Sequence, residues 1–326
     1  MSKALVQAEV LTKHFPIRGG LFSRSSGVVR AVTDVSFDVQ RGETFALMGE
    51  SGCGKTTCAL TMIRLLEPTA GRVLSDGRDI FTLKGKDLLA LRRDFQIVFQ
   101  NPQEAMDPLL SVRSTIEEPL RIHHPELPRR ERRELTCEYT NAVGLRDELL
   151  KRYPRELSGG EQQRVCICRA LVLKPRFIVL DEPSSALDVS VQARVLNLLI
   201  RLKSNFDLTY MFISHNAAVV RWMADRVGVL YLGRLVELRP TEALFSAPSH
   251  PYTSALIQSV LMVGSRLEEK QVVLEGAPPS PTAKLGGCVF YDRCPERLEE
   301  CKREIPTLLE MEKGHWVACH RKRRKA

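Results

Sequence analysis

The sequence predicts an α/β fold built on a parallel sheet. An antiparallel β subdomain precedes the sheet, a helical subdomain is inserted into it, and a small cysteine-containing module follows it. Strand-like and helix-like runs alternate after residue 150, as in parallel sheets with crossover helices. Alternating apolar residues over 4–48 are typical of strands, and residues 109–150 have helical patterning. A proline-containing linker over 276–287 separates the small module.

Composition and charge narrow the class of protein. The chain has 326 residues and is 44% hydrophobic, which is enough for a globular core. It has no apolar run of about 18 residues and no secretion signal at its start, so we expect a cytosolic protein. Residues 321–325 supply five units of the net charge of +9. Such a basic tail is usually a solvated end, and the alternative is that it contacts an anionic membrane face. Nucleic acid is disfavoured, because no basic stripe alternates with aromatic residues.

A glycine-rich stretch over 49–57 follows the apolar run 44–48 and fits the template G-x-x-x-x-G-K-[ST]. Its glycines let backbone N–H groups approach phosphate oxygens, and Lys55 can contact the outer phosphates. The Thr56 hydroxyl suits Mg²⁺, and a helix expected over 57–66 directs its dipole at the anion. A chance turn is the alternative, but it must match four fixed positions. The predicted nucleotide contacts are Gly49, Glu50, Ser51, Gly52, Cys53, Gly54, Lys55, Thr56 and Thr57.

Four polar residues stand at the ends of apolar, strand-like runs: Gln100, Asp181, Glu182 and His215. An unpaired carboxylate at the end of a buried strand costs folding free energy, because the charge loses its water. A bound cation would neutralise it. We therefore predict that Asp181 and Gln100 help to hold Mg²⁺ and that Glu182 polarises a water for attack on a γ-phosphate. Gln100 could instead be an ordinary strand end and His215 a structural histidine, although ligands bind at such strand ends in α/β sheets.

A second motif marks the start of a helix. Ser158 is a natural N-cap and Glu161, three residues later, completes a capping box. Gly159 and Gly160 weaken a helix, and a plain capped helix does not explain them. They make sense where the backbone must approach a partner closely, such as a phosphate at the helix N-terminus. The whole segment is Leu157, Ser158, Gly159, Gly160, Glu161 and Gln162.

Phe15 ends the first predicted strand. The common fate of such a residue is a core or edge aromatic. The alternative is a platform on which an adenine ring stacks, because the ring presents flat apolar faces.

The order of these motifs resembles that of the ATP-binding subunits of ABC transporters over about residues 4–240. The sequence carries the loop 49–57, Gln100, the segment 157–162, Asp181 with Glu182, the turn 185–188 and His215. The resemblance implies a P-loop ATPase core that uses ATP and Mg²⁺. It also implies a head-to-tail dimer, in which each ATP lies between the loop of one subunit and residues 157–162 of the other.

The same resemblance implies roles for single residues. Glu182 becomes the general base or water-positioning carboxylate, and His215 the γ-phosphate sensor. Gln100 becomes the Mg²⁺ and water ligand and a link to the membrane subunit, with Thr56 and Asp181 completing the Mg²⁺ contacts. Phe15 becomes the adenine-stacking aromatic, and Asp188 belongs to the loop that follows the Glu182 strand.

Residues 185–192, residues 250–253 and the cysteine-bearing tail resemble the oligopeptide/dipeptide and nickel importer branch. The expected domains are a cassette over 1–240, with a helical subdomain over about 101–165, and an extension over 241–326. This branch implies two permease subunits, a second cassette, a solute-binding protein and a place on the cytoplasmic face of the inner membrane. The cargo could instead be nickel, glutathione or another small solute. A soluble ABC ATPase without a transport role is disfavoured, because the chain has one phosphate loop and no heptad run.

Four cysteines lie near the C-terminus, at intervals of 5, 6 and 17 residues: Cys288, Cys294, Cys301 and Cys319. These are not the short gaps of zinc ribbons or ferredoxins, so buried or free thiols are the simple interpretation. The family resemblance adds a 4Fe–4S cluster, with zinc as the alternative. His315 and His320 would be spare zinc ligands.

Overall fold

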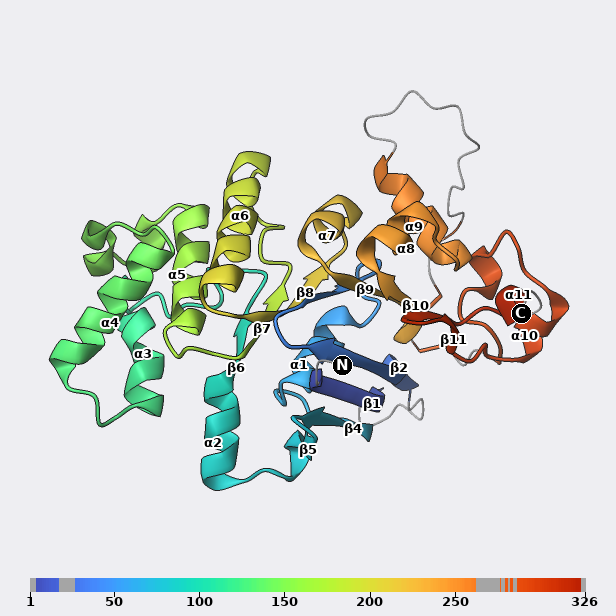
Figure 1. The fold of residues 1–326 in the computed structure, drawn as a ribbon, viewed down its shortest axis with the longest axis horizontal. Helices are drawn as coiled ribbons and strands as arrows, with labels where there is room; N and C mark the ends of the chain where they lie inside the picture. The colour runs from blue at the N-terminus through green and yellow to red at the C-terminus, as the bar shows by residue number, and fades with distance from the viewer. Residues whose placement is uncertain are drawn as a thin grey trace, which may run out of the picture. The chain divides into compact units, whose positions relative to one another are not determined.

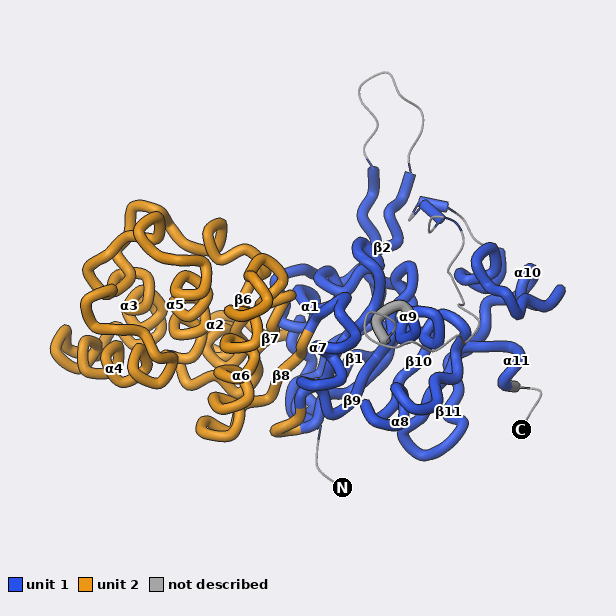
Figure 2. The backbone as a smooth tube through the Cα atoms, turned by 90° about the horizontal axis from the view of Figure 1, so that it is seen from above, with its two compact units in different colours: residues 1–40, 44–81, 213–326 blue, residues 41–43, 82–212 orange. Residues whose placement is uncertain are grey.

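The computed structural model describes residues 4–17, 27–261, 276, 279–280, 282–283 and 286–323. It forms two compact units, drawn in different colours in Figure 2. Unit 1 contains residues 1–40, 44–81 and 213–326, and unit 2 contains residues 41–43 and 82–212. Residues 19–26 of the expected glycine- and serine-rich loop, parts of the expected linker and the end of the basic tail lie outside the described residues.

Unit 1 begins with the expected antiparallel sheet, whose strand order is β2-β1-β4-β5. The long strand β1 (Ala4–Ile17) pairs antiparallel with both β2 (Gly27–Gln40) and β4 (Ala70–Ser75). The short β5 (Arg78–Asp79) pairs with β4. The alternation seen in the sequence puts Val35, Phe37 and Val39 of β2 on the buried side, so this part of the prediction is confirmed.

Unit 1 also holds the strand that leads into the phosphate loop. This strand, β3 (Thr44–Met48), is buried throughout and pairs parallel with β9 (Arg226–Tyr231). Such full burial is typical of a parallel strand covered on both faces. The sheet continues antiparallel through β10 (Arg234–Pro240), β12 (His315–Val317) and β11 (Leu309–Glu312).

The helices of unit 1 are short (Figure 1). The helix after the loop was expected over 57–66, but α1 runs from Lys55 to Met62, because Arg64 has a positive φ that ends the helical path. The others are α7 (Ala217–Met223), α8 (Thr241–Ser246), α9 (Pro251–Leu261), α10 (Glu299–Arg303) and α11 (His320–Arg323). There are also 3₁₀ turns over Ile80–Thr82, whose last residue belongs to unit 2, and over Tyr291–Arg293.

Unit 2 contains the strands β8 (Thr209–Ser214, whose last two residues belong to unit 1), β7 (Phe177–Asp181) and β6 (Phe95–Val98), in that spatial order. Strands β6 and β7 are parallel, as expected. The α-helices are α2 (Gly85–Asp94), α3 (Val112–His123), α4 (Arg129–Ala142), α5 (Gly159–Leu171) and α6 (Val189–Asn205), with 3₁₀ turns over Asp147–Lys151 and Pro154–Glu156. Helices α3, α4 and α5 pack together as a helical cluster (Figure 1).

Among the described helices, none has both the length and the apolar character needed to span a bilayer.

Candidate nucleotide site

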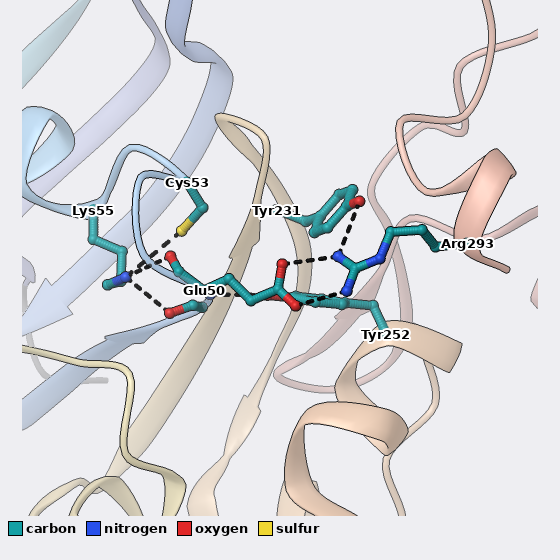
Figure 3. Close-up of polar contacts among 7 residues, drawn as sticks. Glu50, Cys53, Lys55, Tyr231, Tyr252 and Arg293 are labelled. Atoms are coloured by element: carbon teal, nitrogen blue, oxygen red, sulfur yellow. Dashed lines mark hydrogen bonds and ion pairs between the residues drawn. The ribbon is translucent and has the colours of Figure 1, made fainter. Parts of the chain in front are cut away.

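The phosphate loop is held in shape by its own lysine (Figure 3). The ammonium of Lys55 donates to the carbonyl oxygens of Gly49 and Glu50, at 2.8 Å each. The residue is only 5% exposed, so these oxygens replace the water that a buried ammonium requires. The loop therefore presents a positive charge that is already desolvated and fixed in position.

Gly54 explains why the template demands glycine before the lysine. It forms the N-cap of α1 with a φ of +105°, a conformation that residues with a Cβ rarely adopt. A Cβ here would also lie 1.9 Å from the carbonyl oxygen of Ala31 on β2. The position is thus closed to other residues by backbone packing as well as by backbone conformation. Thr56, in the first turn of α1, has an exposed side chain.

Glu50 is tied to the C-terminal part of unit 1 by three contacts (Figure 3). Its backbone N–H donates to the Tyr252 hydroxyl at 2.9 Å. Its carboxylate accepts two hydrogen bonds from the Arg293 guanidinium, at 2.8 and 3.0 Å. Sequence reasoning missed both partners, although Tyr252 lies within the segment 250–253 that it singled out. Because Arg293 is 243 residues from Glu50, no local pattern could have paired them.

In unit 2, the structure brings together two of the predicted catalytic residues. The Gln100 side chain donates from Nε2 to Oε2 of Glu182 at 3.2 Å. Glu182 has a φ of +45°, in the left-handed region that few non-glycine residues occupy. Strain of this kind costs about 1–3 kcal/mol and gathers at functional sites. Asp181, the last residue of β7, is 4% exposed.

The strand ends differ slightly from those expected. Strand β6 ends at Val98, so Gln100 lies two residues beyond it, and β7 ends before Glu182. In the first case a turn begins at Asn101, whose side-chain oxygen accepts the Gln103 N–H. In the second case the positive φ of Glu182 breaks the strand.

The segment 157–162 caps α5 as predicted. The Ser158 Oγ accepts the Glu161 N–H, and the Glu161 carboxylate accepts the Ser158 N–H at 2.9 Å. The N–H and the hydroxyl of Ser158 both donate to the Glu161 carboxylate, and these two hydrogen bonds hold the pKa of Glu161 below its usual value. Gln162 is buried, and its amide donates to the Pro154 carbonyl at 2.8 Å.

The glycines of this segment also serve packing within unit 2. A Cβ on Gly160 would come within 2.6 Å of the Val191 side chain on α6. One on Gly159 would lie 3.2 Å from the Leu187 side chain. Close approach of α6 is therefore a second reason for these glycines, which the sequence did not reveal.

The remaining predicted site residues lie on different elements and make different contacts. In unit 2, Asp188 caps α6 by accepting the Val191 N–H at 3.0 Å, and this bond lowers its pKa. In unit 1, His215 is exposed after β8, and Asn216 caps α7. Phe15 on β1 is half-buried, with the Lys13 ammonium 5.0 Å from its ring centre.

The structure does not support the predicted metal or cluster site. Among the described residues, no group of three or more His, Cys, Asp or Glu side chains could hold a metal ion. The supposed spare ligands are used elsewhere, since Nε2 of His315 lies 3.2 Å from Glu237 and Nε2 of His320 lies 3.0 Å from the Glu304 carbonyl oxygen. Burial raises the pKa of Cys288 to about 12 and that of Cys294 to about 11, and the neighbouring cysteines add to both shifts.

Known proteins with similar sequences and structures include ATP-binding cassettes, in agreement with the phosphate loop described above. A family model described as ABC transporter matches residues 32–185, and one described as oligopeptide/dipeptide transporter, C-terminal region, matches residues 236–301. A structure titled as a dimeric, post-hydrolysis state of the ATP-binding cassette MJ0796 bound to ADP and Pi matches with a TM-score of 0.64. It is 29% identical in sequence, and the match covers 72% of this chain and 98% of that one.

Full-length relatives extend the match to nearly the whole chain. A probable peptide ABC transporter ATP-binding protein, y4tS of Sinorhizobium fredii, is 49% identical over 98% of this chain and 90% of its own length. The oligopeptide transport ATP-binding protein AppF of Bacillus subtilis is 46% identical over 98% of this chain and 97% of its own length. The chain therefore belongs to the family of ATP-binding proteins of ABC transporters, in the branch that carries the oligopeptide/dipeptide transporter C-terminal region.

Proposed function

We propose that this chain is the ATP-hydrolysing subunit of a peptide importer. It works on the cytoplasmic face of the inner membrane with two permease subunits, a second cassette and an extracytoplasmic solute-binding protein. Its cassette spans 1–240, with a helical subdomain over about 101–165, and its extension spans 241–326. The main support for ATPase activity is the phosphate loop, in which hydrogen bonds hold Lys55 in place. The same chain has Glu182 in a strained backbone conformation, hydrogen-bonded to Gln100. The peptide cargo is supported by the names of the relatives.

The proposed steps use the chain's own groups. Lys55 exchanges the carbonyls of Gly49 and Glu50 for the outer phosphates of ATP. Phe15 stacks on the adenine. Backbone N–H groups of the loop contact the phosphates, except that of Glu50, which donates to the Tyr252 hydroxyl. Residues 157–162 of a second cassette, with Asp188 beside them, complete the site.

Hydrolysis depends on a second set of residues. Glu182 orients the attacking water, and Gln100 keeps that carboxylate in place. His215 contacts the γ-phosphate. Thr56, Gln100 and Asp181 offer the hydroxyl, amide and carboxylate oxygens that Mg²⁺ prefers, and bound Mg²⁺ supplies charge neutralisation.

The test of the ATPase is the variant Glu182→Gln. Because the carboxylate is lost but the loop is untouched, ATP should still bind while steady-state hydrolysis falls by about 10²-fold or more. Glu148→Gln is the matched control, since its carboxylate is 84% exposed in the same unit. A hydrolysis rate near that of the unchanged chain would remove Glu182 from its proposed role.

The cargo needs its own experiment. Proteoliposomes with the permeases and the solute-binding protein should take up a labelled dipeptide or oligopeptide only when ATP is present. Uptake of nickel or glutathione but not of peptides would favour the alternative cargo. Failure of the chain to associate with any permease would favour a soluble ABC ATPase.

We also propose a cluster or metal ion at Cys288, Cys294, Cys301 and Cys319, with 4Fe–4S before zinc. The support is the thiol chemistry of this group: burial and the neighbouring cysteines raise the pKa values of Cys288 and Cys294, and a bound cation would lower both. Anaerobically purified protein should contain iron with sulfide, or zinc, and Cys288→Ser should reduce that content. Cys137→Ser, in unit 2, is the matched control and should not. Elemental analysis that finds neither metal in the unchanged protein would contradict this proposal.

A further inference from the structure

The phosphate loop contains a negative charge of its own. Glu50 is the second residue of the loop, and its carbonyl oxygen accepts a hydrogen bond from Lys55. Its carboxylate therefore belongs to the loop that is proposed to receive a triphosphate. Like charges repel strongly where water is partly excluded, so an uncompensated carboxylate here would weaken nucleotide binding.

Arg293 supplies the opposite charge in a well-defined geometry. Its two terminal nitrogens contact the two carboxylate oxygens of Glu50, as a bidentate pair (Figure 3). The Arg293 side chain is 7% exposed and that of Glu50 is 27% exposed. Solvent therefore screens this pair less than it screens a surface ion pair.

The surroundings of Arg293 fix its position. One of its nitrogens lies 3.4 Å from the Tyr231 hydroxyl, and its guanidinium lies 5.9 Å from the centre of that ring. Tyr231, Tyr252 and Phe290 pack against one another with ring centres 4.6–5.4 Å apart. Arg293 and Phe290 come from the cysteine-bearing module, whereas Tyr231 ends β9.

The aromatic cluster of Tyr231, Tyr252 and Phe290 also contacts the loop directly, because the Tyr252 hydroxyl accepts the backbone N–H of Glu50. The cysteine-bearing module thus contacts the phosphate loop through the Arg293 charge, and α9 contacts it through the Tyr252 hydroxyl. Figure 3 shows both contacts converging on Glu50.

We propose that Arg293 is a positioning residue of the nucleotide site, which neutralises Glu50 and so allows the phosphate loop to accept a nucleoside triphosphate. The cysteine-bearing module is then part of the ATP site rather than a separate appendage. This inference rests on the proposed ATPase function and adds to it a dependence of ATP affinity on the C-terminal module.

The test is a charge cycle measured by calorimetric titration with Mg-ATP. Arg293→Met leaves Glu50 uncompensated and should raise the Kd by about tenfold, a change that higher salt should reduce. In the ATPase assay, KM should rise by more than kcat falls. Adding Glu50→Gln to Arg293→Met should bring the Kd back to within about threefold of the unchanged chain. Arg303→Met, which removes an exposed arginine from the same module, is the matched control and should not change the Kd.

Arg293→Lys gives a second measurement that does not depend on the methionine variant folding. It keeps the charge but loses the bidentate geometry, so its Kd should stay within about threefold of the unchanged chain. The proposal is overturned if Arg293→Met binds Mg-ATP normally, if Glu50→Gln fails to restore binding, or if the lysine variant binds as poorly as a well-folded Arg293→Gln variant. If the unchanged chain binds no Mg-ATP, it is the ATPase proposal that fails, which separates the two results.

Discussion

The buried His250 shows how one residue can couple pH to stability. The residue is 2% exposed, and its backbone N–H donates to the Glu237 carboxylate at 2.8 Å. Its ring Nδ1 accepts the backbone N–H of Tyr252. Burial lowers the pKa of His250 to about 3. The imidazole is therefore neutral in the folded chain near pH 7.

This burial predicts acid sensitivity with a definite sign. Between the folded pKa of about 3 and the unfolded value of 6.5, only the unfolded chain binds the His250 proton. The free energy of unfolding should therefore fall as pH drops below 6.5, by at most about 1.4 kcal/mol per pH unit from this group. Urea unfolding at pH 7, 6 and 5 checks this, with His250→Gln as the comparison. Parallel pH profiles for the two proteins would contradict the prediction.

At the scale of elements, the start of α5 depends on a reciprocal pair of hydrogen bonds between Ser158 and Glu161. This cap lies in unit 2 and is complete without any bound group. Its structural role can therefore be measured separately from the role proposed for the same segment in contacting ATP across a dimer.

Ser158→Ala should remove this cap and lower the free energy of unfolding by about 1 kcal/mol, whereas Ser158→Asn should preserve most of it. Urea unfolding followed by circular dichroism measures both changes. Because neither side chain is bulky, both variants should remain folded. Equal stability of the alanine variant and the unchanged chain would show that the cap contributes little.

At the scale of the whole molecule, the C-terminal extension completes the unit that holds the phosphate loop. Strand β12 pairs with β10, and His315 lies against the fully buried Glu237. The same carboxylate accepts the N–H groups of Ser249 and His250. A buried carboxylate that loses all of these partners is strongly destabilising.

Removal of residues 241–326 should therefore prevent unit 1 from folding, even though it leaves all the predicted ATP contacts in the chain. We expect an insoluble product or the loss of a cooperative thermal transition. Removal of residues 324–326 alone is the control and should leave the melting temperature unchanged. A soluble 1–240 fragment that melts cooperatively would show that the extension is dispensable for folding.

The sequence by itself determined the features whose chemical requirements lie in short contiguous stretches. The loop 49–57, the capping box at Ser158 and the strand that ends in Asp181 could all be located in this way, because phosphate contact, helix capping and strand burial each demand particular residues at fixed spacing. A parallel sheet with crossover helices also followed from the alternation after residue 150, but the pairing of β6 with β7 in that sheet came from the structure.

Only the tertiary structure decided which distant residues complete these features. Three examples involve residues that are distant in the chain or lie on different elements. They are the pairing of Arg293 with Glu50, the packing of Gly160 against Val191 and the burial of His250. The left-handed backbone of Glu182 was equally hidden. The physical reason is that burial, charge pairing and strain depend on what surrounds a residue in space, and neighbours along the chain do not specify those surroundings.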